Sequence, residues 1–388
     1  MKNKVLIIFK YPHGWNIPVI NKFSNYYGTE FLYISNLKNK NFNEVIEEIN
    51  NLIKSKNIDI VVFDVDYFKF INLFFIQRIN AKKKILWTGD DFELHSMNAI
   101  TASGCDLIIS TCPLSVLKYK EKGYEAYITH GEDGKIRTNK ELKKEIDVLF
   151  FGALTPDRKE FLEYIGKEGI NIKNVAHDEG VSGLSENELK KLISKSKIVL
   201  NLSKTRTTSL SNFSSEKVYK FYYQTKGRII MAGMNGAACV SEYSPMQELL
   251  YNNEEIPTFY TKEECVKILK KLIQNDELLK ELTNKFTAKT EQLFEDKKSF
   301  KPIFDAIEKD DNRKVKIIKV PYWYLRIAAK QIILRNIKIS NFFKIMPQLK
   351  IIFKIIEDSN FFVKLLILFE SILSTLWYSF VLTIKPKN

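Results

Sequence analysis

Cysteine and histidine are scarce in this sequence, which contains only four of each among its 388 residues. No two cysteines have the C-x-x-C spacing, and the histidines are scattered along the chain. A structural zinc site needs about four closely spaced ligands of these types. The composition therefore argues against such a site, and we predict no metal ligands.

The N-terminus lacks the long apolar segment of a signal peptide. Its apolar run covers only Val5–Phe9, which is the length of a buried strand. Together with the scarcity of cysteine, this favours a reducing, cytoplasmic setting.

Acidic residues are depleted at the C-terminal end. The formal net charge is +14, and residues 313–388 contain 14 Lys/Arg against 3 Asp/Glu. The rest of the chain is therefore nearly neutral. Such asymmetry points to an anionic partner for this end, either a membrane or a nucleic acid. No nucleic-acid-reading motif accompanies the charge, so nucleic acid is not expected and an anionic membrane surface is favoured.

The length favours two domains, and the hydrophobic pattern repeats an alternation of strands and helices. In the first half, four apolar runs read as strands, and helical spacing lies between them. These runs are Val5–Phe9, Ile58–Asp64, Lys84–Thr88 and Asp106–Thr111. Strands separated by helices pair in parallel, so we expect an open doubly wound sheet.

A polar stretch, residues 131–145, is interpreted as a linker, and a second α/β series follows it. Strands are predicted at Asp147–Gly152 and Ile198–Leu202. Ser185 and Glu188 form a capping box that opens a helix. Another helix begins near Ile229 and can end at Gly236. The predicted domains are residues 1–140, 141–312 and a tail of 313–388.

The tail is basic, aromatic and mostly helical by its pattern. Leu349–Ile356 has cationic amphipathic spacing, and residues 365–384 contain a single charge, Glu370. Binding at a membrane surface is one interpretation, supported by the interleaved aromatic residues. A membrane span over 365–384, and packing against the body or a second subunit, remain alternatives.

Several segments, taken in order, resemble the CgeB-like, spore-maturation-type branch of the GT-B glycosyltransferases. The similarity covers roughly residues 55–295. The segments that carry it are Ile58–Phe63, Leu86–Asp90, Cys105–Ser110, Asp147–Gly152 with Arg158, Ser196–Asn201 and Gly227–Gly236. The resemblance implies two Rossmann-like domains facing across a cleft. The donor, a nucleotide sugar, would lie on the second domain and the acceptor on the first.

The resemblance also implies a reaction without a metal ion or other cofactor, because basic side chains and helix N-termini would neutralise the leaving diphosphate. One departure from the family pattern concerns two glutamates that many GT-B members use to contact the donor. Tyr223 and Met231 occupy the matching positions here. This leaves the donor and the activity itself open.

Candidate donor-binding residues follow the strand ends of the second series. Gly152 would let a phosphate approach the backbone, or is a plain turn glycine. Arg158 would reach a diphosphate, or is a solvated residue of a first helical turn. The remaining candidates are Asn201, Ser203, Lys204, Arg206, Arg228, Glu242, Tyr243 and Ser244. Each could equally be an ordinary loop or capping residue.

Candidate catalytic residues lie in the first half. His13 follows the first strand and could act as the general base, since the pKa of histidine is near working pH. Asp90, at the end of another strand, could deprotonate an acceptor hydroxyl instead. Asp90 and Asp91 could also cap the next helix.

These observations predict a cytoplasmic GT-B glycosyltransferase, peripheral at the inner membrane leaflet. It would move a sugar from a nucleotide sugar to a hydroxyl of a cell-surface glycan or of a lipid-linked glycan precursor. A catalytically inactive scaffold or binding subunit is the alternative, and a sugar-nucleotide epimerase is a third. The sugar, nucleobase, acceptor, stereochemical outcome and any homo-oligomer stay open.

Overall fold

The computed structural model describes residues 3–12, 16–65, 70–89, 91–130, 142–175, 184–204, 225–309, 320–337, 352–353, 361–370 and 373. The chain forms two compact units. One unit contains Met1–Ile109, Tyr119–Ala126 and Ile307–Asn388, and the other contains Ser110–Lys118 and Tyr127–Ala306. The C-terminal residues therefore return to the unit that contains the N-terminal sheet.

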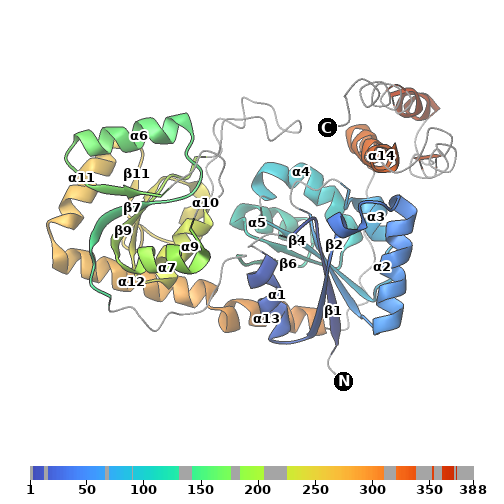
Figure 1. Cartoon of the computed structure of the whole chain (residues 1–388), viewed down its shortest axis with the longest axis horizontal. Coiled ribbons are helices and arrows are strands. Elements are labelled where there is room, and N and C mark those ends of the chain that lie inside the picture. Colours follow the sequence, from blue (N-terminus) through green and yellow to red (C-terminus); the bar gives the residue numbers. More distant parts are fainter. Residues whose placement is uncertain are drawn as a thin grey trace. The chain divides into compact units, whose positions relative to one another are not determined.

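The first unit is built on a six-stranded sheet with the order β2-β1-β3-β4-β5-β6. The pairings of β1 with β2, of β1 with β3 and of β3 with β4 are parallel. Its strands are β1 (Lys4–Phe9), β2 (Gly28–Tyr33), β3 (Ile60–Asp64), β4 (Lys83–Thr88), β5 (Leu107–Ser110) and β6 (Ala126–Ile128). The predicted parallel α/β sheet is confirmed, and Figure 1 shows its strands fanned by twist.

Helices connect these strands. They are α1 (Asn16–Ser24), α2 (Phe42–Lys56), α3 (Leu73–Gln77), α4 (Asp91–Thr101) and α5 (Pro113–Glu121), with short 3-10 turns η1 (Ile34–Leu37) and η2 (Ala102–Gly104). The helical spacing predicted between the first two apolar runs is confirmed by α2. It opens with a capping box between Asn41 and Glu44, and it buries Val45, Ile46 and Ile49 on one face.

The second unit contains a five-stranded sheet with the order β11-β10-β9-β7-β8. Its strands pair in parallel. They are β7 (Ile146–Phe150), β8 (Ile172–Asn174), β9 (Ser196–Asn201), β10 (Ala238–Glu242) and β11 (Thr258–Phe259). Asn201 pairs with Ser241, and Glu242 pairs with Phe259. This register aligns the carboxyl ends of β9, β10 and β11 at one edge of the sheet.

Alternate residues of these strands enter two separate cores, as the period of two requires. Val148, Ile198 and Val240 pack under α6 (Pro156–Lys167) and α11 (Lys262–Ile273). Leu149, Val199 and Cys239 pack under α7 (Glu186–Ser194), α9 (Gly227–Met234) and part of α12 (Asp276–Phe294). Figure 1 shows these helices on opposite faces of the sheet. The remaining helices are α10 (Pro245–Glu248) and α13 (Asp296–Glu308).

Two predicted helix signals are confirmed in this unit. Ser185 and Glu188 form the capping box of α7. Helix α9 ends at Met234, and Gly236 follows it with a φ of 70°, a conformation that favours glycine. Within α9, Gly233 lies against Thr290 of α12 so closely that a Cβ would collide with that side chain. The sequence also predicts a helix at Ser215–Gln224, which lies outside the described residues.

Part of the C-terminal segment packs on the first unit. Helix α14 (Tyr322–Ile337) inserts Tyr324, which is buried, and its hydroxyl accepts a hydrogen bond from the backbone N–H of Leu73 at 2.8 Å. The same hydroxyl is 2.8 Å from the Thr101 hydroxyl. Thus the packing alternative holds for this part of the tail.

Residues 361–370 form a further helix in the first unit. Its Glu370 pairs with Arg326 of α14 at 2.6 Å, so the charge in the apolar run has an opposite charge beside it. Within the described part of the chain, no helix is both long and apolar enough to cross a bilayer.

Candidate functional site

Polar and basic side chains gather at the carboxyl edge of the second sheet, where ligands bind in open parallel α/β folds. They come from the loops that follow β7, β9 and β10, and from the first turns of α6 and α9. The predicted donor residues that the structure brings to this edge are Gly152, Arg158, Asn201, Ser203, Lys204, Arg228 and Glu242. We call this group the donor-side cluster.

Arg228 is the second residue of α9, and its guanidinium is buried, with 8% of the residue exposed. The guanidinium carbon lies 4.7 Å from the ring centre of Phe150 and 5.5 Å from that of Phe151. Nη1 donates to Asn201 Oδ1 at 3.1 Å. Burial, followed by the neighbouring charge of Arg158, lowers the pKa of Arg228 to about 9. The side chain is therefore still a cation at neutral pH.

This cation lacks an anionic partner within the described part of the chain. Its Nε is buried and has no hydrogen-bond partner there. An unpaired buried charge is destabilising by several kcal/mol, on the order of the desolvation of one ion. A bound anion would offset this charge.

Gly152 explains how the guanidinium fits. The glycine has a φ of 107°, which residues with a side chain rarely adopt. A Cβ at this position would lie 2.5 Å from Arg228 Nη2. The strand end therefore needs glycine both for its backbone conformation and for the space that Arg228 occupies. The alternative, that Gly152 is a plain turn glycine, does not account for its close contact with Arg228.

Arg158 is also buried, with 7% of the residue exposed, so the alternative of a solvated side chain is wrong. It lies in the first turn of α6, which Thr155 caps. Its guanidinium donates to the backbone carbonyls of Ala153 at 2.7 Å and Lys204 at 2.9 Å. Arg158 therefore joins the loops after β7 and β9. It also places a second positive charge near Arg228.

Asn201 and two serines form a buried polar layer below the cations. Asn201 Nδ2 donates to Ser203 Oγ at 3.0 Å and to Ser241 Oγ at 2.8 Å. Its Oδ1 holds Arg228, so Asn201 orients the guanidinium. Ser203 Oγ also donates to the backbone carbonyl of Glu242 at 2.8 Å. This layer ties β9 to β10 at their carboxyl ends.

Lys204 and Glu242 form the rim of the cluster. The backbone N–H of Lys204 donates to the Glu242 carboxylate at 2.8 Å, and its Nζ lies 3.7 Å from Asp157. Burial raises the pKa of the Glu242 carboxyl, although the Lys204 N–H and nearby cations oppose this shift. Tyr243 follows on the same strand end, and Ser244 is buried at the residue before α10.

Four residues of the sequence prediction have no described position. His13, Asp90, Arg206 and Tyr223 lie outside the described residues. Met231, at the second position that departs from the family pattern, lies in α9 and is partly buried against the core.

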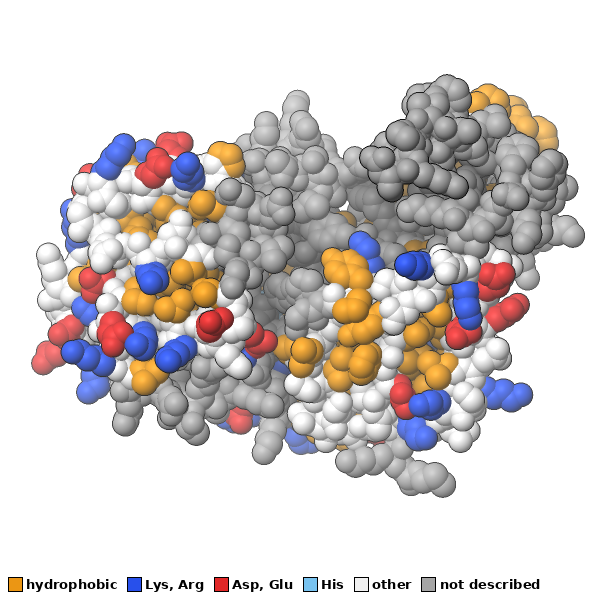
Figure 2. All heavy atoms as spheres, in the orientation of Figure 1, with side chains coloured by type: hydrophobic (Ala, Val, Ile, Leu, Met, Phe, Trp, Pro, Cys, Tyr) orange, Lys and Arg blue, Asp and Glu red, His pale blue; other side chains and the backbone are white. Residues whose placement is uncertain are grey.

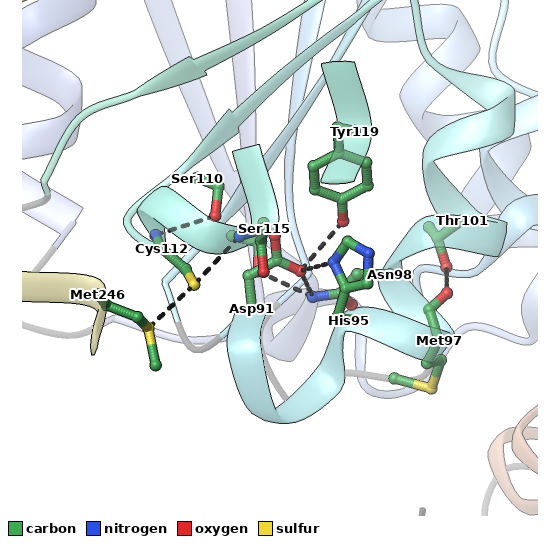
Figure 3. Close-up of polar contacts among 11 residues, drawn as sticks. Asp91, His95, Met97, Asn98, Thr101, Ser110, Cys112, Ser115, Tyr119 and Met246 are labelled. Carbon is green, nitrogen blue, oxygen red and sulfur yellow. Dashed lines mark hydrogen bonds and ion pairs between the residues drawn. The ribbon is translucent and has the colours of Figure 1, made fainter. Parts of the chain in front are cut away.

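The carboxyl edge of the first sheet contains a different cluster, which Figure 3 shows in close-up. Asp91 begins α4 and is fully buried. Its Oδ1 accepts hydrogen bonds from Asn98 Nδ2 at 2.9 Å and from the Tyr119 hydroxyl at 3.0 Å. His95 Nδ1 lies 3.9 Å away, and the His95 ring is 4.7 Å from that of Tyr119.

Sequence reasoning missed this grouping, although one signal was available. Asp91, His95 and Asn98 have helical spacing and so share one face of α4. The contribution of Tyr119 comes from α5 and has no counterpart in the local sequence. Because side chains of the protein already bond to Asp91, its placement is that of a structural group and not of a base that faces a substrate.

Comparisons with known proteins agree with this architecture. Residues 136–297 match a family model described as glycosyl transferase-like. No curated protein sequence matches the chain.

Three solved structures are similar over most of the chain. An alpha-glucosyltransferase in complex with UDP and a 13-mer DNA has a TM-score of 0.52 at 13% identity, covering 80% of this chain and 100% of that one. HepE from Anabaena in complex with UDP has a TM-score of 0.52 at 11% identity, covering 79% and 99%. A sucrose-phosphate synthase from Thermosynechococcus elongatus has a TM-score of 0.50 at 8% identity, covering 79% of this chain and 97% of that one. At these identities the likeness establishes the fold, which is that of the GT-B glycosyltransferases.

Proposed function

We propose that this chain is a glycosyltransferase that takes a sugar from a UDP-sugar. The observation that carries the proposal is the buried Arg228, which has no anionic partner within the described part of the chain. A diphosphate would supply the missing charge. The glycosyl transferase-like match over residues 136–297 supports the reaction class, and two similar structures in complex with UDP support the nucleotide.

In the proposed reaction, the bond between the anomeric carbon and the diphosphate oxygen breaks, and the acceptor hydroxyl oxygen bonds to that carbon. Negative charge then grows on the leaving UDP. Arg228, Arg158 and Lys204 place positive charge where it grows, in a partly water-excluded site where such charges act most strongly. The N-terminus of α9, which begins at Gly227, adds its partial positive charge.

The acceptor proton would leave to a base of the first domain, and His13 and Asp90 remain the proposed bases. The donor-side cations would perform the electrostatic role that a metal ion performs elsewhere, so we propose that the reaction needs no metal or other cofactor. Several sequence segments, taken in their order along the chain, resemble the CgeB-like branch. This resemblance supports placing the chain in that branch.

The experiment is a donor screen on the full chain. We expect UDP to raise the melting temperature, and one UDP-sugar to be hydrolysed slowly without acceptor and used faster with it, both in the presence of a chelator. Mass spectrometry of products formed from membrane extract would identify the acceptor, which we propose is a cell-surface or lipid-linked glycan. A chain that binds UDP but turns over no donor would favour the scaffold alternative, which the apolar Met231 supports. Absence of UDP binding would overturn the proposal.

We also propose that the C-terminal segment binds an anionic membrane surface from the cytoplasmic side. The exposed apolar residues of helix 361–370 and of residue 373 are Phe361, Phe362, Leu365, Leu366, Phe369 and Leu373, which are 48–79% exposed. In Figure 2 hydrophobic side chains reach the surface at the upper right, where Figure 1 places this helix. An apolar face within a strongly basic segment suits the headgroup region of a bilayer.

Vesicle sedimentation tests this part of the proposal. Replacing both Phe361 and Phe362 by serine should weaken binding to vesicles with anionic lipid at least about tenfold. Phe31→Ser is the control, because Phe31 is 50% exposed in β2. If the double variant sediments as the wild type does, or if the wild type binds no vesicles and dimerises through this helix, the membrane assignment fails.

A further inference from the structure

Strand β2 is at one end of the first sheet within the described part of the chain, so one of its two backbone edges faces away from the other strands. It has 6 residues, whereas the strands at the other sheet ends, β6, β8 and β11, have 3, 3 and 2. Proteins usually protect such an edge by keeping the strand short or by placing lysine or proline in it. The sequence of β2, Gly-Thr-Glu-Phe-Leu-Tyr, contains neither. Its length and composition therefore favour pairing with a further strand.

Two aromatic side chains lie on one face of this strand. Phe31 is 50% exposed, and its ring centre is 5.5 Å from that of Tyr33. The Tyr33 ring is in turn 5.9 Å from that of the buried Phe9 in β1. Figure 2 shows hydrophobic side chains at the surface of the first unit where Figure 1 places β1 and β2. A partner strand could therefore pack against an aromatic side chain as well as form backbone hydrogen bonds.

The hydrogen bonds between β2 and β1 show which backbone groups face outward. The N–H of Gly28 donates to the carbonyl of Asn3 at 3.4 Å, so Gly28 directs its backbone groups toward β1. Successive residues of a strand direct these groups to opposite sides. The backbone groups of Thr29, Phe31 and Tyr33 therefore point away from β1. These three residues are spaced symmetrically about Phe31.

We propose that β2 pairs antiparallel with β2 of a second copy of this chain, about a two-fold axis that passes between the two Phe31 residues. Phe31 of each copy exchanges both of its backbone hydrogen bonds with Phe31 of the other. The N–H of Tyr33 donates to the carbonyl of Thr29 in the other copy. Residues directly opposite each other have side chains on the same face, so the two Phe31 rings meet. A two-fold interface requires such self-complementarity, which is why a second copy fits this edge better than an unrelated strand.

The charges on β2 are compatible with this pairing. Glu30 is the one charged residue of the strand, and its carboxylate lies 2.9 Å from Lys56 Nζ at the end of α2. In the proposed register Glu30 lies opposite Leu32 of the second copy, and the two Glu30 side chains are diagonal neighbours. Because each Glu30 is paired with a lysine, their like charges are compensated. The dimer joins the 6-stranded sheets of the two copies into one continuous sheet.

The proposed interface is small. A strand of 6 residues from each copy buries less than the roughly 1,600 Å² of a standard interface, so we expect a dissociation constant in the micromolar range. At lower protein concentrations the chain is monomeric. The vesicle experiment is run at such concentrations, so Phe31→Ser remains a valid control there.

Analytical ultracentrifugation of the full chain over a range of concentrations tests the proposal. We expect the wild type to form a dimer. Phe31→Lys should weaken it at least about tenfold, because the ring contact is lost and like charges lie directly opposite each other. Leu117→Lys is the matched control, since Leu117 in α5 is also 50% exposed, and it should dimerise normally. The double serine variant at Phe361 and Phe362 should also dimerise normally, which separates β2 from helix 361–370.

Disulfide cross-linking gives a second measurement, which reports the register and does not depend on loss of affinity. Phe31→Cys should form a linked dimer on mild oxidation, because the Cα atoms of such an opposite pair are about 5.5 Å apart. Thr29→Cys and Tyr33→Cys should cross-link when the two variants are mixed, and neither should do so alone. The wild type controls for the native cysteines and should give no linked dimer.

Two results would overturn the proposal. The first is a wild type that stays monomeric at about 100 μM, together with a Phe31→Cys chain that does not cross-link. The second is a wild-type dimer that Phe31→Lys does not weaken, or cross-links that follow another register, because the contact would then lie on a different surface. Neither result bears on UDP binding, so the proposed function is tested separately.

Discussion

The carboxyl edges of the two sheets both contain a buried charged residue, and the two residues differ in how their hydrogen-bonding groups are satisfied. On the first sheet, the buried Asp91 carboxylate accepts hydrogen bonds from Asn98 and Tyr119. On the second sheet, among the described residues, the buried Arg228 guanidinium donates one hydrogen bond, to Asn201, and its Nε has no partner. Within the part of the chain that the structure describes, the same architecture therefore supports a carboxylate with several partners and a cation with few.

From this difference we propose that Asp91 is a structural group and that Arg228 is a binding group. Hydrogen bonds to a charged group stabilise a fold by about 1.5–3 kcal/mol each, and they are lost when the group is removed. An unpaired buried cation does the opposite, because its desolvation is offset only when an anion binds. We therefore expect Asp91 to matter for the stability of the chain and Arg228 to matter for ligand affinity.

The largest expected effect follows from Arg228→Met, which removes the charge but keeps an unbranched side chain. UDP binding should weaken by about 100-fold or more, since charge-assisted hydrogen bonds to the diphosphate are lost. The melting temperature without ligand should stay the same or rise. Calorimetry and thermal unfolding measure the two quantities. Lys271→Met on α11 is the control for net charge and should bind UDP normally. An unfolded Arg228→Met chain would show that Arg228 is structural.

The reverse pattern is expected at Asp91. Asp91→Ala leaves Asn98 and Tyr119 without their shared acceptor and should lower the free energy of unfolding by about 2–4 kcal/mol. Asp91→Asn keeps an acceptor oxygen and should be milder. Urea unfolding measures both, and UDP affinity of the folded protein should not change. Loss of transfer activity in a fully stable Asp91→Asn chain would assign Asp91 to catalysis instead.

Gly152 offers a sharper test of the contact with Arg228. In Gly152→Ala, backbone strain at a φ of 107° and the collision with Arg228 Nη2 act together. Stability should fall by about 1–3 kcal/mol, and UDP affinity should fall about tenfold. Gly169→Ala is matched, because Gly169 has a φ of 84° but nothing within 4 Å of an added Cβ. It should lose stability only. Equal UDP affinity in Gly152→Ala and Gly169→Ala would show that Gly152 does not contribute to UDP binding.

The smallest effect concerns Glu242, whose carboxyl pKa is raised by burial. In the pH range just above its ordinary value of 4.5, the folded state holds this proton more tightly than the unfolded state does. The stability contributed by Glu242 is therefore present at lower pH and decreases as pH rises through that range. Relative to the wild type, Glu242→Gln should gain less than about 1 kcal/mol between pH 4 and 7. If the difference in free energy of unfolding between Glu242→Gln and the wild type does not change between pH 4 and 7, the raised pKa of Glu242 is contradicted.

Local sequence signals were enough for much of the architecture. Apolar runs such as Val5–Phe9 and Ile198–Leu202 predicted buried strands, because a strand covered on both faces needs apolar side chains throughout. The Ser185 and Glu188 capping box predicted the start of α7 for a similarly local reason. Parallel pairing followed from helices between strands. The residues that follow these strands were therefore expected at the carboxyl edge, and those in the donor-side cluster do lie there.

What those residues do at the edge depended on long-range packing. The sequence shows Arg158 as a polar residue in a first helical turn, yet the fold turns it inward to backbone carbonyls of two loops. The stacking of Tyr243 on Tyr260 and the bond from Tyr119 to Asp91 join segments that are far apart in the chain or lie on different elements. Side-chain periodicity is a local property, and it determined the strands, the helices and their faces. Burial, charge pairing and ring stacking depend on which elements meet in space, so only the tertiary structure decided them.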